Sequence, residues 1–273
     1  MLRVGLIGCG SIGTVLARAI GEDVVKRVRL DAVYDIDHEK SEELSQMLHP
    51  RPFIAPDFNT LLHQSLDIII EAASQEAVTL YGEAILKAQK DLMIMSVGAL
   101  LQNGLLERLE ETAVKCRRRI YIPSGAVAGI DAIKAAALGG LEEVTITTRK
   151  PPNGLKGAPF LKEKNIDIEN ITEPVLVYEG PAEEAVRLFP ANVNVAAVLS
   201  IAGVGKRKTK VRVIADPGID TNQHEIKAKG NFGELCCVTK NFPCPDNPKT
   251  SYLAALAAIR TLERIASVLR IGT

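Results

Sequence analysis

The stretch Leu2–Gly13, LRVGLIGCGSIG, runs from an apolar segment into three glycines spaced as Gly-x-Gly-x-x-Gly. Leu2–Ile7 predicts a buried strand, and the residues from Ser11 to Ile20 predict a helix. At such a turn the first glycine permits the tight bend, the second lets a pyrophosphate approach the backbone, and the third lets helix and strand pack closely. N–H groups at the helix N-terminus attract phosphate. The turn predicts a dinucleotide site formed by Gly8, Gly10, Ser11, Ile12 and Gly13. Glycines that serve only the turn are the alternative.

An acidic residue follows this motif at a fitting distance. Asp35 lies 22 residues after Gly13, at the end of the predicted strand Val28–Tyr34. A carboxylate at this position accepts hydrogen bonds from the adenosine ribose, which favours NAD. His38 and Lys40 stand close by, and a cation there would accommodate the 2′-phosphate of NADP. We therefore expect NAD or NADP as the cofactor. An Asp that serves only solubility is the alternative.

The first part of the chain alternates short apolar runs with amphipathic stretches. Further strands are predicted at Leu66–Ile70, Leu92–Met95 and Arg119–Ile122, with helices at Glu76–Lys90 and up to Cys116. This alternation predicts an α/β fold, a Rossmann-type doubly wound parallel sheet. Ligands of such sheets bind at the carboxyl ends of the strands. We therefore expect the loops containing Ala73 and Ser96 near the nicotinamide. Ordinary tight loops are the alternative.

The pattern changes after Pro123. Alternating strands are predicted at Val144–Arg149, Pro174–Tyr178, Lys210–Ala215, His224–Lys229 and Glu234–Thr239, and helices at Ala182–Leu188 and Val193–Ile201. Turns rich in Gly and Asn join the last three strands, which predicts an antiparallel meander. We thus expect a dinucleotide-binding domain at 1–123 and an α+β substrate and oligomerisation domain, with a mostly antiparallel sheet, at 124–248. The helix within 249–273 is expected to return to the first domain.

Composition excludes several classes of protein. The formal net charge of +0 gives no support for a nucleic-acid partner. No segment approaches the roughly 18 apolar residues of a membrane span, and the chain opens on a strand-like run rather than a signal peptide. The 5 cysteines lack the spacing of a zinc or redox motif. We expect free thiols, no metal and a cytoplasmic location.

Removal of a hydride from carbon beside nitrogen requires a base for the ammonium proton. Of the 4 histidines, His224 stands apart in the polar segment Asp216–Ile226. A structural histidine is the alternative. Asn194 opens a helix of small residues, where it either caps the helix or binds a carboxamide. Arg149 and Lys150 either bind substrate carboxylates or end a strand in solvent.

Several segments together resemble the L-aspartate dehydrogenase family, in order along nearly the whole chain. They are VGLIGCGSIG at 4–13, IPSGAVAGID at 122–131, TRKPP at 148–152, FPANVNVAA at 189–197, ADPGIDTNQHEI at 215–226, GNFGE at 230–234 and NPKTS at 247–251. The resemblance implies that His224 is catalytic and that Ala126 and Asn194 contact the cofactor. It also implies oxidation of L-aspartate by NAD or NADP to iminoaspartate. That product hydrolyses to oxaloacetate and ammonia or supplies NAD biosynthesis.

Two other readings remain open from the residues. One is a related imine or carbonyl reductase, of the dihydrodipicolinate reductase or homoserine dehydrogenase type. The other is a non-catalytic NAD-binding redox sensor, although no basic recognition helix or acidic tail supports it. The exposed face of the second-domain sheet predicts a homodimer. The other expected partner is a small-molecule substrate.

Overall fold

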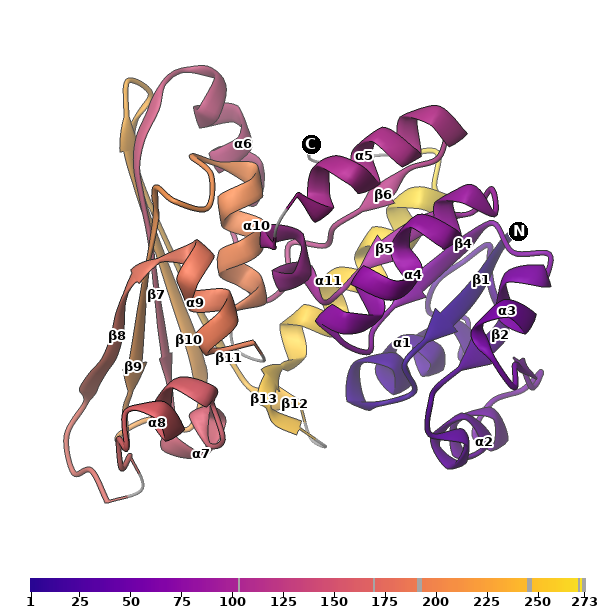
Figure 1. Cartoon of the computed structure of the whole chain (residues 1–273), viewed down its shortest axis with the longest axis horizontal. Helices are drawn as coiled ribbons and strands as arrows, with labels where there is room; N and C mark the ends of the chain where they lie inside the picture. The colour runs from indigo at the N-terminus through magenta and orange to yellow at the C-terminus, as the bar shows by residue number, and fades with distance from the viewer. Residues whose placement is uncertain (103, 169, 191–192, 245–246, 270, 272–273) are drawn as a thin grey trace. The chain divides into compact units, whose positions relative to one another are not determined.

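A computed structural model describes residues 1–273 apart from 103, 169, 191–192, 245–246, 270 and 272–273. The chain forms two units. One comprises Met1–Pro123 together with Ala255–Ile271, and the other comprises Ser124–Ala254 (Figure 1). Within the described residues, no helix combines the length and the apolar character needed to cross a membrane. The cytoplasmic location stays a prediction.

The first unit is built on a parallel sheet. Its strands are β1 (Leu2–Ile7), β2 (Val28–Tyr34), β3 (Phe53–Ile54), β4 (Ile68–Glu71), β5 (Asp91–Ile94) and β6 (Ile120–Tyr121). They lie in the order β3-β2-β1-β4-β5-β6, and every pairing is parallel. The strand order reverses between β1 and β4, which is the switch point where doubly wound folds bind dinucleotides. The Rossmann-type prediction is therefore confirmed.

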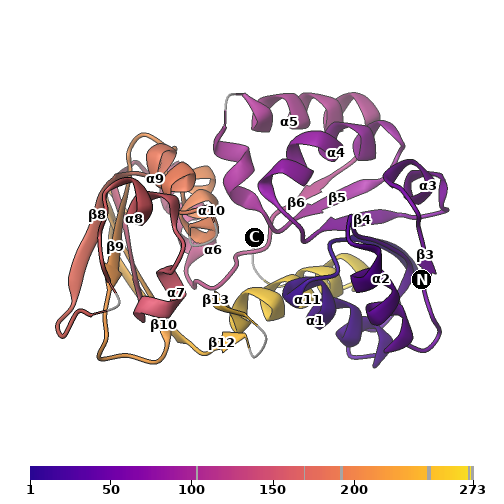
Figure 2. The same cartoon turned by 60° about the horizontal axis from the view of Figure 1, so that its bottom comes forward.

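Helices cover both faces of this sheet. They are α1 (Ser11–Gly21), α2 (His38–Gln46), α3 (Phe58–His63), α4 (Gln75–Lys87), the 3-10 helix η1 (Val97–Leu101), α5 (Leu105–Cys116) and α11 (Tyr252–Ala266). Figure 2 shows α4 and α5 on one face, with α1 and α11 on the other. Ala258 and Leu262 of α11 belong to the same buried cluster as Leu16 of α1 and Val4 of β1. The last long helix thus completes the core that the first strand begins.

Two elements of the first unit were not predicted from the sequence. Strand β3 has 2 residues and helix α3 has 6, so neither is long enough to show a period. Their boundaries follow local chemistry instead. The Asp57 side chain caps α3 by accepting a hydrogen bond from the Thr60 N–H at 2.7 Å. Short elements of this kind are visible only once their neighbours are placed.

The second unit contains a mixed sheet of five strands. They are β7 (Leu141–Lys150), β8 (Val175–Pro181), β9 (Thr209–Ala215), β10 (Asn222–Gly230) and β11 (Gly233–Asn241), in the order β11-β10-β7-β9-β8. The β7–β9 pairing is parallel, and the other three are antiparallel. The prediction of a mostly antiparallel sheet is confirmed. Strands β12 (Pro243–Cys244) and β13 (Asn247–Ser251) form a separate small ladder.

The predicted antiparallel meander of β9, β10 and β11 is wrong. β7 lies between β9 and β10, so only β10 and β11 form a hairpin. The alternating pattern identifies each strand and its buried face, but it carries no information about which strand lies beside it. The segment after β9 instead crosses β7 before β10 begins.

One face of the second sheet is covered by helices. The helices of this unit are α6 (Ile130–Leu138), α7 (Pro152–Leu155), α8 (Pro159–Glu163), α9 (Ala182–Leu188) and α10 (Asn194–Ala202). Figure 1 shows α6, α9 and α10 on the same side of the strands. Alternate residues of β7, β9 and β10 are buried on this covered face. The open face carries charged residues, including the Lys210–Glu179 and Lys227–Glu225 ion pairs. One-sided cover explains the alternation in the sequence.

Candidate active site

Two of the three motif glycines are required by the fold itself. Gly8 has φ of 97°, and a Cβ there would lie 2.6 Å from the carbonyl oxygen of Ala72. A Cβ on Gly13 would lie 2.0 Å from the carbonyl oxygen of Gly8. No side chain fits at that distance, so only glycine lets α1 start this close to β1. These two positions shape the turn whether or not a ligand binds.

The remaining residues of the turn are arranged as a phosphate site requires. A Cβ on Gly10 would meet no atom within 4 Å, so the fold itself leaves room there. Gly10 also precedes α1 without a side-chain cap, which leaves N–H groups of the first turn available. The Ser11 hydroxyl oxygen is buried and has no hydrogen-bond partner in the described part of the chain. Phosphate oxygens would satisfy these donors, so a dinucleotide fits the turn.

Asp35 is tied to the same turn. Its Oδ2 accepts a hydrogen bond from the Cys9 N–H at 2.7 Å, and its Oδ1 accepts one from the Asp37 N–H at 3.0 Å. The carboxylate is therefore held in place by the backbone and does more than keep the chain soluble. Lys40 forms an ion pair with Asp37 at 3.1 Å. This arrangement is compatible with either a ribose hydroxyl or a 2′-phosphate nearby.

Ala73 and Ser96 are joined by a residue that the sequence analysis did not select. Glu71, the last residue of β4, is 1% exposed. Its carboxylate accepts hydrogen bonds from the Ala73 N–H at 2.8 Å, the Ser96 N–H at 3.0 Å and the Ser96 hydroxyl at 2.8 Å. Burial raises the pKa of Glu71. The only signal in the sequence was an acidic residue that ends the apolar run LDIII.

The predicted catalytic histidine lies in the second unit, on the covered face of the sheet. His224 is the third residue of β10 and is 3% exposed. Its neighbours across the sheet are Thr148 of β7 and Thr239 of β11. The Thr148 hydroxyl and His224 Nδ1 are 3.0 Å apart, within hydrogen-bond distance. This contact occupies Nδ1 and leaves Nε2 as the nitrogen that can take a proton.

Lys150 lies two residues beyond Thr148 on β7 and is also 3% exposed. Burial lowers the pKa of Lys150 to about 7. The pKa of His224 is lowered to about 3, first by burial and then by the charge of Lys150. The imidazole is therefore neutral at neutral pH.

Arg149 and Lys150, which the sequence could not separate, have different surroundings. Successive strand residues point to opposite faces of a sheet. The Arg149 guanidinium donates to Asp216 Oδ2 at 2.7 Å, and Asp216 Oδ1 accepts a hydrogen bond from the Gly218 N–H at 2.8 Å. Arg149 is therefore engaged in fixing the turn after β9. Lys150 shares the face of Thr148 and His224.

Ala126 and Asn194 lie in the same unit as the histidine. The Ala126 carbonyl oxygen accepts hydrogen bonds from the Thr239 hydroxyl and the Asn241 amide, both at 2.9 Å. Among the described residues, no hydrogen bond uses the Ala126 N–H. A Cβ on Gly125 would lie 3.3 Å from Val195, so the start of α10, with Asn194, lies against this loop. The Ala126 loop thus connects β11, the strand beside His224, to the start of α10.

The predicted residues thus fall into two groups. Gly8, Gly10, Ser11, Ile12, Gly13, Asp35, Ala73 and Ser96 lie at the carboxyl ends of β1, β2, β4 and β5 in the first unit. Ala126, Asn194 and His224 lie in the second unit. In the described part of the chain, no three His, Cys, Asp or Glu side chains gather as a metal site requires.

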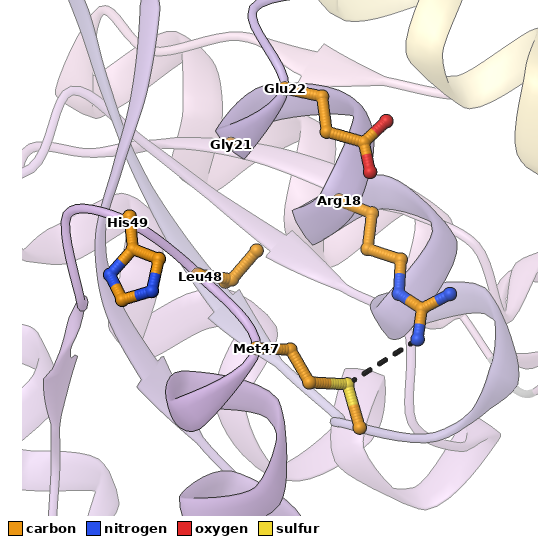
Figure 3. A pocket seen from close by; sticks show the side chains of 6 residues that line it. All are labelled: Arg18, Gly21, Glu22, Met47, Leu48 and His49. Carbon is orange, nitrogen blue, oxygen red and sulfur yellow. Dashed lines mark hydrogen bonds between the residues drawn. The ribbon is translucent and has the colours of Figure 1, made fainter.

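A surface hollow of about 360 Å³ lies away from these groups (Figure 3). It is lined by Arg18, Glu22 and His49, and Arg18 donates a hydrogen bond to the Met47 sulfur at 3.5 Å. Arg18 and Gly21 are at the C-terminal end of α1, whereas the glycine turn is at its N-terminal end. The hollow is therefore not the phosphate site.

Comparisons with known proteins match this arrangement. Residues 8–123 match the model of the homoserine dehydrogenase NAD-binding domain, and residues 131–265 match the model of the aspartate dehydrogenase C-terminal region. The chain is 49% identical to an L-aspartate dehydrogenase of Methanosarcina barkeri (strain Fusaro / DSM 804), and the alignment covers 100% of both chains. The chain belongs to the L-aspartate dehydrogenase family. A relative from Nitrosopumilus maritimus (strain SCM1) is 45% identical, again over 100% of both chains.

Solved structures agree with this membership. The crystal structure of aspartate dehydrogenase from Thermotoga maritima is 27% identical, with a TM-score of 0.76 and 100% of both chains covered. A homoserine dehydrogenase from Thiobacillus denitrificans is 14% identical, with a TM-score of 0.62, and the alignment covers 97% of this chain and 73% of that enzyme. At this identity the likeness shows the fold alone. The predictions of the family, of an NAD(P)-dependent amino-acid dehydrogenase and of NAD or NADP as cofactor are confirmed. The roles of individual residues stay predictions.

Gly10→Ala should separate cofactor binding from folding. Gly10 is in extended backbone, with φ −77° and ψ −164°, and its added methyl would meet nothing. We expect the free energy of unfolding to change by less than about 1 kcal/mol. The methyl would occupy the space of the pyrophosphate, so the Kd for NADH should rise about tenfold or more. Denaturant unfolding and calorimetric titration measure the two effects.

Gly13→Ala is the contrasting variant, whose free energy of unfolding should fall by about 3 kcal/mol or more because the added methyl clashes with Gly8. Unchanged NADH affinity in Gly10→Ala would contradict the assignment.

The buried charge of Lys150 predicts a pH-dependent loss of stability. Between pH 10.5 and 7 the Lys150 amine is protonated in the unfolded chain but largely neutral in the folded chain. Wild-type stability therefore falls as the pH falls through this range, by on the order of 4 kcal/mol. Lys150→Met keeps the volume and lacks this loss. Its unfolding free energy should exceed that of wild type most near pH 7, and the difference should shrink toward pH 10. The exposed Lys134→Met variant of α6 is the control, and a difference independent of pH would contradict the prediction.

Proposed function

We propose that the chain oxidises L-aspartate to iminoaspartate with NAD or NADP. The imine then hydrolyses to oxaloacetate and ammonia, or leaves as iminoaspartate to supply NAD biosynthesis. The observation that carries this proposal is a buried neutral imidazole, His224, beside a buried cation, Lys150, on one face of a sheet. Relatives named L-aspartate dehydrogenase that match the chain from end to end support it.

The first step assigned to the chain is proton removal. His224 Nε2 accepts a proton from the substrate ammonium, which leaves a lone pair on the amine nitrogen. Throughout the step, the His224 Nδ1–H donates a hydrogen bond to the Thr148 hydroxyl oxygen at 3.0 Å, which fixes the ring. When bound, the oxidised nicotinamide supplies the acceptor for the hydride that leaves Cα. The C–H electron pair leaves with the hydride, and the nitrogen lone pair forms the C=N bond.

The cofactor is held by the first unit. The N-terminus of α1 and the Ser11 hydroxyl would bind the pyrophosphate, and Asp35 would accept hydrogen bonds from the ribose hydroxyls. Ala73 and Ser96 lie on the loops that Glu71 holds together, next to the nicotinamide half. Ala126 and Asn194 of the second unit are the further residues that the family resemblance assigns to the cofactor. The imidazolium releases its proton to solvent, and the neutral imidazole then takes a proton from the water that adds to the iminium carbon and passes it to the departing amine, which completes the cycle.

Reduced-nicotinamide absorbance tests the proposal. With NAD and then NADP, L-aspartate should give reduction, whereas glutamate, alanine and homoserine should give little. His224→Asn should lower kcat by about 10² to 10⁴ because the base is lost. Its Kd for NADH should stay near that of wild type. His63→Asn is the matched control, since His63 is exposed on α3 and, among the described residues, its ring forms a hydrogen bond with the Asn59 carbonyl oxygen alone. Reduction by homoserine in preference to aspartate would instead support a homoserine dehydrogenase. Cofactor binding without any turnover would support the redox sensor.

The open face of the second-unit sheet supports a homodimer. It exposes Val238 of β11 and Leu176 of β8 among charged residues, and the helices that cover the sheet lie on the other face. An uncovered sheet face with apolar side chains is a natural contact surface. Sedimentation equilibrium should give about twice the chain mass of 29.4 kDa, and Val238→Glu should shift the mass toward one chain. A wild-type mass of one chain would contradict the dimer.

A further inference from the structure

Glu71 is a buried carboxylate that proton transfer by His224 does not use. It ends β4, the strand beside β1 at the switch point of the first-unit sheet, and it is 1% exposed. The rest of β4 is Ile68–Ile70, so an apolar residue would suit the buried end of this strand. Burial of a carboxylate costs free energy unless hydrogen bonds compensate it. The carboxylate must therefore contribute something that the strand itself does not require.

The Glu71 carboxylate joins two loops that are far apart in the sequence. Its Oε1 accepts hydrogen bonds from the Ala73 N–H and the Ser96 hydroxyl, each at 2.8 Å. Its Oε2 accepts one from the Ser96 N–H at 3.0 Å. Burial raises the pKa of Glu71, and these hydrogen bonds oppose that rise. One side chain thus fixes the loop between β4 and α4 and the loop between β5 and η1.

The first of these loops also contacts the glycine turn. An added Cβ on Gly8 would lie 2.6 Å from the Ala72 carbonyl oxygen and 2.8 Å from the Ala73 nitrogen. Asp35, the candidate partner of the adenosine ribose, follows β2, on one side of β1, whereas β4 and β5 lie on the other side. A dinucleotide whose pyrophosphate lies at the turn therefore extends its nicotinamide half toward the loops that Glu71 holds.

We propose that Glu71 is a positioning residue for the nicotinamide half of the cofactor. By fixing both loops before the cofactor binds, it strengthens binding of that half and leaves binding of the adenosine half unchanged. Loops that are already ordered lose less entropy when a ligand binds. The adenosine half has its own support, because the Cys9 N–H holds Asp35. The inference rests on the proposed placement of the cofactor along this edge of the sheet.

The test compares NADH with ADP-ribose, which lacks only the nicotinamide ring, by calorimetric titration into the whole chain. Glu71→Gln keeps the size of the side chain. Whichever way its amide is turned, the NH₂ group faces a backbone N–H, so one loop is released. The Kd for NADH should rise about tenfold, and the Kd for ADP-ribose should change less than about twofold. Glu110→Gln, at an exposed position on α5, should leave both constants unchanged.

Asp67→Asn separates positioning from a general loss of stability. Asp67 lies just before the same strand, at its amino end. There its carboxylate accepts hydrogen bonds from the Arg3 N–H at 2.8 Å and the Arg3 guanidinium at 2.7 Å. Both Asp67→Asn and Glu71→Gln should lower the denaturant midpoint of unfolding. Only Glu71→Gln should raise the ratio of the NADH Kd to the ADP-ribose Kd. An equal rise of this ratio in Asp67→Asn overturns the inference.

Ser96→Ala keeps the test available if Glu71→Gln does not fold. The single hydrogen of the Ser96 hydroxyl is donated to Glu71, so this group has no hydrogen left to donate to the cofactor. The variant removes that hydrogen bond and keeps the one from the Ser96 N–H. The Kd for NADH should rise about threefold, with the Kd for ADP-ribose unchanged.

The inference is overturned if folded Glu71→Gln, or Ser96→Ala in its place, binds NADH as tightly as wild type. It is also overturned if the affinities for NADH and ADP-ribose fall by the same factor. Gly10→Ala tests the placement of the cofactor separately, because its methyl should weaken both ligands. If it weakens neither, the placement and this inference both fail. A Glu71-dependent ratio in a chain that turns over no aspartate upholds the positioning role and overturns the proposed function.

Discussion

The approach of Gly13 to the Gly8 carbonyl oxygen is the contact on which the first unit depends. A Cβ on Gly13 would lie only 2.0 Å from this oxygen, so the strand and the helix contact each other through backbone atoms with no side chain between them. Because α1 starts there, Leu16 and Ile20 reach the buried cluster of β1, and α11 completes the same cluster. The contact that permits the fold also leaves the helix N-terminus open beside Gly10. The fold of this unit and the proposed phosphate site are thus consequences of one short turn.

Two carboxylates, the half-buried Asp35 and the buried Glu71, organise the loops around that turn. Asp35 holds the Cys9 N–H, and Glu71 holds the two loops that contain Ala73 and Ser96. Each carboxylate accepts hydrogen bonds from groups that strands leave unsatisfied at their ends. The loops at the carboxyl edge are therefore fixed before any ligand arrives. Such preorganisation reduces the entropy lost on binding.

The second unit buries several polar residues on the covered face of its sheet. Its sheet is covered on one face, so polar residues on that face lose water and must find partners there. Thr148, Lys150, Asn222, His224 and Asn241 are all buried on it. Thr148 meets His224, and Asn241 holds the Ala126 loop. Burial of a cation and an imidazole together keeps the imidazole neutral, which is the state a base requires.

The sequence alone determined the period and order of the elements, the glycine turn with Asp35, and the choice of His224 through family resemblance. These are local patterns, because the type of each residue restricts its backbone conformation or the face of the helix or strand on which it lies. The tertiary structure decided which strands are neighbours, and so it replaced the meander by an order in which β7 separates β9 from β10. The tertiary structure also revealed the role of Glu71. It showed that Lys150 is buried whereas Arg149 is paired with Asp216, a difference that the sequence of these two neighbouring cations did not indicate. Burial and hydrogen-bond partners depend on segments far apart in the chain, and no local pattern encodes them.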